Sequence, residues 1–305
     1  MPAKRTYPVA LTIAGSDSGG NAGLQADLRA FHGFGVHGCT AIAALTAQNQ
    51  DGVAGVLPVL PEFLCLQLEA IFSGYAVGAV KTGMLQNAGL IETAARVLRC
   101  HRGIPLVVDP VMVATSGARL LEDAAVAALK RRLLPLATLI TPNLPEAEVL
   151  LGRPLATDCD AQSAAVELAR RYCCAVLLKG GHDRAHPACD LLCISRNLLR
   201  LSTPVVRKPL STHGTGCTLS AAIAAAIATG QPLLKAVVEG KSFVYAAIRA
   251  GGCVGPHAAV LGMVQRRGTA CVLVENCSYI HPSTVRKAGQ RCRQMAQRVF
   301  PRDPI

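Results

Sequence analysis

The 305-residue sequence predicts an α/β protein, a three-layer αβα sandwich in which helices cover both faces of a mostly parallel central sheet. Short apolar segments of strand length alternate with segments of helical length, and this alternation is typical of βαβ units around a buried sheet. Apolar residues make up 51% of the chain and aromatic residues only 4%. The core must therefore be built mainly from Ala, Val, Leu and Ile, which favours α/β layers.

The apolar pattern places each element along the chain. The expected strands cover residues 9–14, 39–45, 77–81, 106–108, 139–141 and 175–179. The expected helices cover residues 24–34, 62–72, 89–100, 123–134, 146–151, 161–172 and 219–228. Residues 191–194 and 199–202 should form an antiparallel hairpin at an edge of the sheet, preceded by a mobile flap at 180–187.

No internal repeat or low-complexity linker interrupts the chain before about residue 263, so the simplest organisation is one domain over residues 1–262 and a basic extension over residues 263–305. The formal net charge is +12, and about half of it lies in this extension. Such charge attracts anions, but it does not distinguish a nucleic acid from ATP. Within the extension, Ser283 could cap a helix through Val299 that stands outside the core.

The thirteen cysteines are odd in number and contain no Cys-x-x-Cys pair, which argues against a disulfide framework and a zinc ribbon. A reducing, cytoplasmic location is therefore expected. No apolar run approaches the ~18 residues of a membrane-spanning helix. Residues 9–14 are too short an apolar run for a signal peptide. We expect a soluble protein with no membrane partner.

Polar residues follow the expected strands at the sheet edge where ligands of such folds bind. Asp109, Asn143 and Lys179 come directly after strands, and Glu146 lies one helical turn beyond Asn143. Carboxylate and amide oxygens there could hold Mg²⁺ directly or through water. A helix-capping role is at least as good an interpretation for any one of them.

A glycine-rich turn with the sequence HGTGCT occupies residues 213–218 and opens the apolar helix. The unpaired N–H groups of a helix start could bind a phosphate or a developing oxyanion. The turn is not a Walker loop, because no Gly-Lys-Ser/Thr follows it, and it could equally serve only to cap the helix. Cys217 lies where the helix field favours a thiolate, which makes it a candidate base.

These segments together resemble the hydroxymethylpyrimidine/phosphomethylpyrimidine kinases of thiamine biosynthesis, within the ribokinase-like superfamily. The resemblance rests on AGSDSGG (14–20), AGLQAD (22–27), TAQN (46–49), KTGML (81–85), DPVM (109–112), TPNLPE (141–146) and GTGC (214–217). It runs from about Val9 to Gly262, and residues 263–305 match nothing in the family. Nucleotide contacts from the C-terminal side are therefore left open.

The resemblance implies roles for individual residues. Asp27 and Gln48 would hydrogen-bond the aminopyrimidine alcohol, and the slot around it would be shaped by Gly15, Ala22, Met84 and Val111. Core packing remains an alternative for Met84. Lys179 would lie near the ATP phosphates, and the turn of Gly214, Thr215, Gly216 and Cys217 would form the anion hole. Asp109, Asn143 and Glu146 would organise Mg²⁺, with Asn143, Gly214 and Gly216 also near the nucleotide.

The implied activity is ATP-dependent phosphorylation of hydroxymethylpyrimidine and then of its monophosphate, by a homodimer. The nearest alternative is a pyridoxal or pyridoxine kinase, because the ring alcohols are similar. A second alternative, a nucleic-acid-binding regulatory protein on a kinase fold, is suggested only by the basic extension. Asp109, Lys179 and the glycine-rich turn argue against an inactive site, so nucleic acid is not the expected partner.

Overall fold

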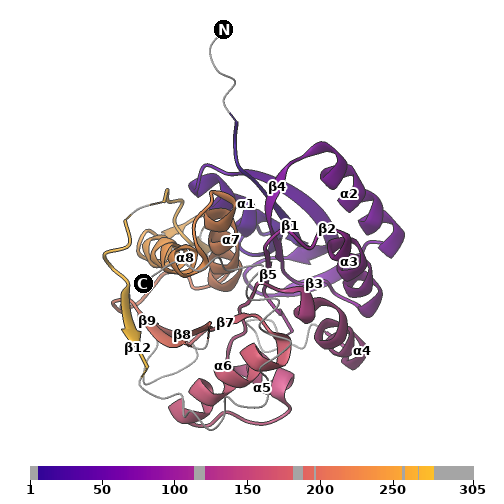
Figure 1. Cartoon of the computed structure of the whole chain (residues 1–305). Coiled ribbons are helices and arrows are strands. Elements are labelled where there is room, and N and C mark those ends of the chain that lie inside the picture. The colour runs from indigo at the N-terminus through magenta and orange to yellow at the C-terminus, as the bar shows by residue number, and fades with distance from the viewer. Residues whose placement is uncertain are drawn as a thin grey trace.

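The computed structural model describes residues 6–112, 121–180, 188–195, 197–255, 258–266 and 268–277. The expected αβα sandwich is confirmed: a ten-stranded sheet separates two groups of helices (Figure 1). Helices α1, α7 and α8 pack on one face, and α2 to α6 cover the other. Each face buries its own apolar cluster, as a three-layer arrangement requires.

The sheet has a parallel centre and antiparallel margins. Its order is β12-β9-β8-β7-β6-β5-β4-β1-β2-β3. The neighbouring strands β7, β6, β5, β4, β1 and β2 are all parallel to one another. The bounds are β1 Val9–Asp17, β2 His37–Gln48, β3 Val53–Pro58, β4 Val77–Thr82, β5 Leu106–Val108, β6 Leu139–Ile140, β7 Ala175–Leu178, β8 Cys189–Ile194, β9 Asn197–Ser202 and β12 Leu273–Asn276. A separate pair consists of β10 Gly252–Cys253 and β11 Ala259–Val260.

The expected helices are all present, with ends shifted by a few residues, and the structure adds α8. The helices are α1 Gly23–Gly33, α2 Pro61–Gly74, α3 Ala88–Cys100, α4 Asp123–Ala128, α5 Leu144–Leu151, α6 Asp158–Tyr172, α7 Thr215–Ala228 and α8 Leu233–Arg249. Helix α4 continues through a π-helical turn, Leu129–Leu133, and a 3-10 turn, Leu134–Leu136. Helix α8 crosses α7 at Gly240, where a Cβ atom would lie 2.7 Å from Ile223 Cγ1.

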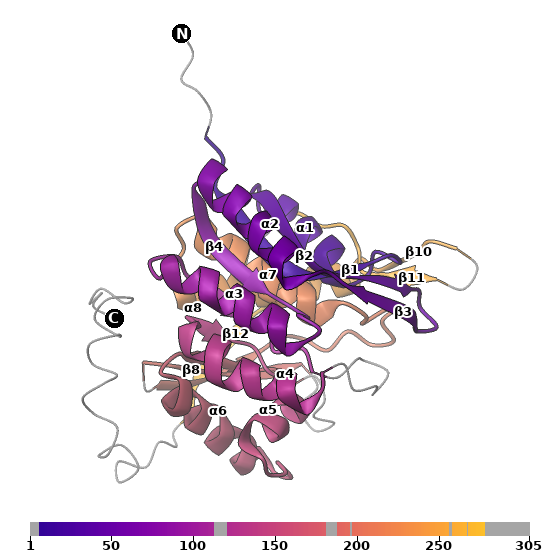
Figure 2. The same ribbon diagram turned by 90° about the vertical axis from the view of Figure 1, so that its right-hand side faces the viewer.

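One expectation about the margins of the sheet is wrong, and one margin strand was not predicted. The β8–β9 hairpin forms as expected, but it is not at the edge, because β12 pairs with β9. The other margin is β3, which was not expected. Both β3 and β12 are short, and none of their residues is buried, so they lack the alternation of buried and exposed residues that marks a strand in a sequence. Figure 2 shows β3 beside β10 and β11, where Gln50 Nε2 donates to the carbonyl of Ala259.

The described part of the predicted extension contacts the domain that precedes it. Arg266 pairs with Glu239 of α8 at 2.6 Å, and its backbone N–H donates to Gly33 of α1. The backbone N–H of Cys277 donates to Leu198 of β9, beside β12. Residues 263–266 and 268–277 thus contact α1, α8 and β9 of the preceding domain. The expected flap at 181–187 and helix at 283–299 lie outside the described residues.

Truncation should reveal this contribution. A chain ending at Gly262 is expected to be less stable than one ending at Cys277, because it loses the β12 ladder and leaves the buried Glu239 carboxylate unpaired. Breaking such a pair costs about 3 kcal/mol, which lowers the melting temperature of a domain of this size by on the order of 10 °C. Thermal unfolding of both truncations measures the difference. Equal melting temperatures would contradict the role of residues 263–277.

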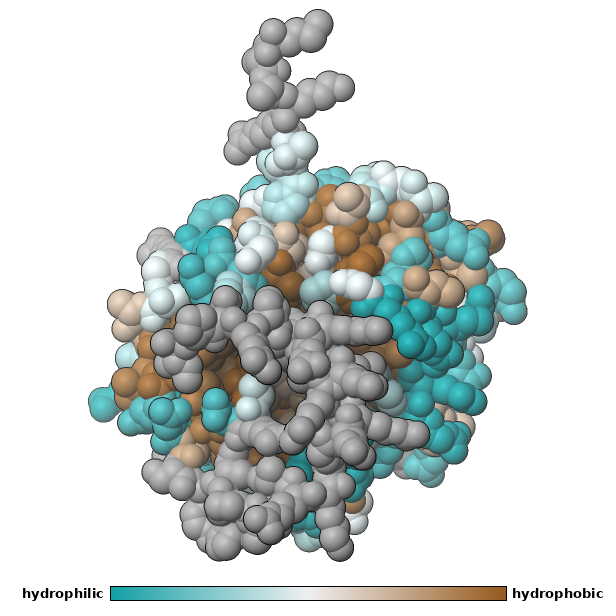
Figure 3. Space-filling view, viewed as in Figure 1, coloured by the Kyte–Doolittle hydropathy of each residue, from teal (hydrophilic) through white to brown (hydrophobic). Residues whose placement is uncertain are grey.

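In the described part of the chain, the helices lack the length and apolar character that crossing a membrane requires. Figure 3 shows hydrophilic and hydrophobic residues interspersed on the face seen in Figure 1.

Candidate active site

A cavity of about 750 Å³ lies at the carboxyl ends of β1, β4, β5 and β7. Its walls also include the segment before α1, the end of β2, the first turn of α7 and one side of α8. The volume is in the range of sites that bind small molecules. Because the sheet order brings these strand ends together, polar residues far apart in the sequence meet in one place.

Lys179 and Asp109 form an ion pair at the base of this cavity. Lys179 Nζ lies 2.8 Å from Asp109 Oδ1 and 4.0 Å from Glu146 Oε2. Burial opposes the charged forms, but the two carboxylates more than offset it and raise the pKa of Lys179. Likewise, Lys179 and Lys81 outweigh the effect of burial and hold the pKa of Asp109 below its ordinary value. The pair is therefore charged at neutral pH.

Asn143 and Glu146 form the capping box of α5, so the capping alternative is realised. Asn143 Oδ1 accepts from the backbone N–H of Glu146, and Glu146 Oε2 accepts from that of Asn143, both at 2.8 Å. Burial raises the pKa of Glu146 to about 7, although Lys179 opposes this. Within the described ranges, no group of three or more His, Cys, Asp or Glu side chains is arranged to hold a metal ion. Any Mg²⁺ here needs oxygen ligands from phosphate or water as well.

The glycine-rich turn meets the ion pair from the opposite side. Helix α7 begins inside the turn at Thr215, and its N-cap Gly214 has a φ of 82°. A side chain on Gly214 would also collide with the carbonyl oxygen of Asn21, so the position requires glycine. A Cβ on Gly216 would lie 3.4 Å from Lys179 Nζ. The N-terminus of α7 therefore faces Lys179 and Asp109 across a short gap, which suits a phosphoryl group.

Cys217 lies in the first turn of α7 and lines the cavity. Burial raises the pKa of its thiol to about 11, with Lys81 acting in the opposite direction. The expectation that the helix field favours a thiolate is therefore wrong for the resting protein. The N-terminus of a helix stabilises a thiolate only modestly. This stabilisation is smaller than the free-energy cost of removing the thiolate from water.

The predicted substrate residues, with one exception, line one end of the cavity. Gln48, Ala22, Met84 and Val111 all contribute to its wall. Gly15 also lines it, and a Cβ atom there would lie 2.8 Å from Met84 Cε, so glycine leaves room for that side chain. These residues come from five separate segments of the chain and line the same cavity.

Asp27 is the exception, and its expected contact with substrate is wrong. Its side chain is fully buried and does not line the cavity. Both carboxylate oxygens accept from Lys81 Nζ, at 2.8 and 2.7 Å, and Oδ2 also accepts from Thr12 Oγ1 at 2.6 Å. Helix α1 holds Asp27 against the sheet, where the buried ammonium of Lys81 requires a counter-ion.

Removing one partner of this buried pair should be costly. Lys81→Met is expected to destabilise the fold by about 3–5 kcal/mol, because it leaves the Asp27 carboxylate buried without its cation. The double variant Lys81→Met/Asp27→Leu should recover a large part of this loss. Chemical denaturation of the two variants measures the difference in free energy of unfolding. A double variant as unstable as the single one would mean that shape, and not charge, is decisive.

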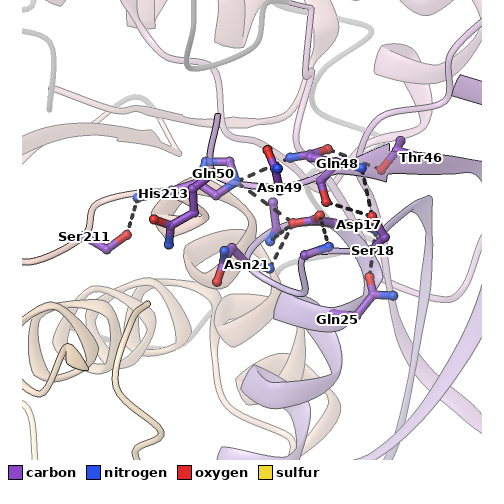
Figure 4. A network of polar contacts seen from close by, with 12 residues as sticks. Asp17, Ser18, Asn21, Gln25, Thr46, Gln48, Asn49, Gln50, Ser211 and His213 are labelled. Atoms are coloured by element: carbon purple, nitrogen blue, oxygen red, sulfur yellow. Dashed lines mark hydrogen bonds and ion pairs between the residues drawn. The ribbon is translucent and has the colours of Figure 1, made fainter. Parts of the chain in front are cut away.

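Sequence reasoning missed several polar residues of the site. Asp17 ends β1, and its carboxylate accepts from the backbone N–H groups of Gly19, Asn21 and Ala22, which fixes the segment before α1 (Figure 4). An Asp followed by Ser and Gly at a strand end is a turn signal that could have indicated this. His213 also lines the cavity. The sequence pattern placed His213 at the start of the glycine-rich turn but indicated no role for its side chain.

A second ion pair lies on the α8 side of the cavity. Lys241 Nζ is 2.6 Å from Asp190 Oδ2, and Asp190 Oδ1 accepts from the backbone N–H of Gly180, next to Lys179. Lys241 and Tyr245 bring α8 into the cavity wall. The cavity wall therefore does receive side chains from the C-terminal part of the chain.

The fold and the site together define a class. A parallel sheet whose carboxyl edge places a Lys–Asp pair opposite a glycine-capped helix N-terminus is built to bind a phosphate beside a small-molecule slot. These are the features of a small-molecule kinase of the ribokinase-like type. Residues 17–262 match the family model for phosphomethylpyrimidine kinase, and the chain belongs to this family.

Individual relatives agree with this assignment. The chain is 49% identical over 244 residues to the hydroxymethylpyrimidine/phosphomethylpyrimidine kinase of Rhizobium meliloti, covering 79% of this chain and 91% of that protein. It is 47% identical to a thiamine biosynthesis bifunctional protein of Geobacter sulfurreducens, over 78% of this chain and 49% of that protein. The ADP complex of Bacillus subtilis pyridoxal kinase superposes with a TM-score of 0.78 at 35% identity, covering 85% and 98% of the two chains. The expected family and kinase class are confirmed.

Proposed function

We propose that this chain transfers the γ-phosphoryl group of ATP to the hydroxyl of hydroxymethylpyrimidine and then to the resulting monophosphate, in thiamine biosynthesis. The observation that carries the proposal is the slot around Gln48, which opens onto the Lys179–Asp109 pair and the N-terminus of α7. Names of relatives with 49% and 47% identity support the substrate and the pathway.

In phosphoryl transfer, the protein mainly positions the reactants and stabilises the charge that develops in the transition state. Lys179 and the backbone N–H groups of Gly214, Gly216 and Cys217 would face the place where charge on the phosphoryl oxygens develops. Asp109 and Glu146 would hold Mg²⁺ together with phosphate oxygens and water, and the ion would neutralise part of the phosphate charge. ATP as donor is supported by the relative solved with ADP.

The proposal is tested by a coupled assay with ATP and hydroxymethylpyrimidine, followed by separation of the monophosphate and pyrophosphate products. The monophosphate should appear first and the pyrophosphate after it. The likeness to a pyridoxal kinase favours pyridoxal as the alternative substrate. A kcat/KM that is higher for pyridoxal than for hydroxymethylpyrimidine would overturn the proposal.

Gln48 should discriminate the pyrimidine from ATP. Gln48→Leu is expected to lower kcat/KM for hydroxymethylpyrimidine by about 10²-fold, because substrate groups that need the amide are left unpaired, while the KM for ATP changes little. Steady-state kinetics with each substrate varied in turn measures both. Equal losses for the two substrates would point to a misfolded site.

We also propose that the protein is a cytoplasmic homodimer. Cysteines such as Cys39, Cys193 and Cys217 are free thiols, which suits a reducing compartment. The exposed edge strand β3 can pair with its symmetry mate about a two-fold axis. Analytical ultracentrifugation tests the dimer, and a single sedimenting species of monomer mass would exclude it.

A further inference from the structure

The backbone of Gln48 is fixed, but its side-chain amide is held less firmly. Ser18 Oγ donates to the carbonyl of Gln48 at 2.7 Å and accepts from its N–H at 2.8 Å. The hydroxyl of Thr46 lies 3.3 Å from Gln48 Oε1 but only 2.9 Å from the carbonyl of Ser16. The single hydroxyl hydrogen of Thr46 is shared between these two acceptors, and the shorter contact to Ser16 is favoured. Thr46 therefore restrains the orientation of the Gln48 amide only weakly.

The other neighbour of the amide is His213. Its Nε2 lies 3.4 Å from Gln48 Nε2 and 4.0 Å from Asp17 Oδ2. An amide NH₂ group only donates, so this contact requires a neutral ring whose proton is on Nδ1 and whose Nε2 accepts. Both residues line the cavity, and Figure 4 shows Gln48, Asp17 and their polar neighbours.

The position of His213 is itself well determined. Its backbone N–H donates to Ser211 Oγ at 3.2 Å, and the next residue, Gly214, lies against the carbonyl of Asn21. The carboxylate of Asp17 fixes that same segment through Asn21 and Ala22. The backbone from which the imidazole extends is thus held by two segments that also line the cavity, and the ring itself contacts Gln48 and Asp17.

We propose that His213 is a specificity-determining positioning residue, which fixes the orientation of the Gln48 amide by accepting from its NH₂ group. The amide oxygen then remains available to accept from the exocyclic amino group of an aminopyrimidine. A 4-oxo pyrimidine offers an acceptor at that place and would require the amide to turn over, breaking the contact with His213. This inference rests on the proposed function, because it concerns the recognition of the same substrate.

The experiment compares kcat/KM for hydroxymethylpyrimidine with that for its 4-oxo analogue. In His213→Leu, the preference for the amino compound should fall by about three- to tenfold, the effect of one hydrogen bond, with the KM for ATP unchanged. His213→Gln places an acceptor oxygen near the position of Nε2 and should restore the preference. In a Gln48→Leu background, His213→Leu should change the preference no further.

The outcomes separate the two proposals. Intact protein that phosphorylates neither pyrimidine overturns the proposed function and this inference with it. Activity with the same preference in wild type and His213→Leu overturns only the role of His213. An equal fall in preference with and without Gln48 would show that His213 acts on the substrate by another route, and this also overturns the inference. If His213→Leu unfolds below assay temperature, His213→Gln carries the test: a lost preference in this variant overturns the inference.

Discussion

Lys179→Met is expected to lower kcat for both phosphorylations by about 10²–10³-fold. The ammonium lies 2.8 Å from Asp109 and faces the N-terminus of α7, where the transferred phosphoryl group gains charge. Met keeps the length of the side chain but removes the charge. Because the same phosphoryl group is transferred in each step, both steps should lose rate to a similar degree. Single-turnover rates with the alcohol and with the monophosphate measure the two losses.

A matched control is Lys130→Met. Lys130 lies in the π-helical turn after α4, and its Nζ donates to the carbonyl of Val149, away from the cavity. Its removal should leave both rates unchanged. Circular dichroism must show that Lys179→Met remains folded, because Asp109 and Glu146 lose their buried cation. A higher KM with an unchanged kcat would contradict the assigned role of Lys179.

The parts of the fold that could be predicted from the sequence are those that are buried. Strands such as β5 and β7 are apolar throughout because helices cover both faces, and such runs are visible in a sequence. Strands β3 and β12 are exposed, and their pairing depends on which backbone edge is free after the rest has folded. That information is tertiary, so no local pattern carries it.

The same contrast explains the site. Residues fixed by backbone position, such as Lys179 after β7 and the turn at 214–217, lie where the sequence pattern places them. The expected substrate contact of Asp27 failed because its carboxylate is buried against Lys81, which is remote in the sequence. The expected thiolate at Cys217 failed because burial raises the pKa of its thiol. His213 was missed because its relation to Gln48 spans 165 positions. Contacts between residues so far apart in the sequence are determined by the tertiary structure, so no local pattern predicts them.

Cys217→Ser should separate the two chemical steps. The first nucleophile is a neutral alcohol that must lose a proton, and a positioned base supplies ~10²–10⁴-fold in such a step. The monophosphate is already anionic at neutral pH, with a second pKa near 6 if it resembles a phosphoserine. We therefore expect a large loss in the first phosphorylation and a small one in the second. The backbone N–H groups of α7 survive the substitution, so phosphate binding should be retained.

The pKa of Cys217 adds a test of the same idea by pH. Because burial raises the pKa of the thiol to about 11, only a small fraction is thiolate at pH 7. This fraction grows about tenfold with each pH unit below that value. If the thiolate is the base, the rate of the first step in the wild type should rise steadily from pH 7 to pH 10. The rate of the second step should stay nearly level, since its nucleophile is already ionised. In Cys217→Ser the rise in the first step should disappear. A first step that is level with pH in the wild type would mean that the proton leaves by water and that Cys217 acts through the shape of the anion hole.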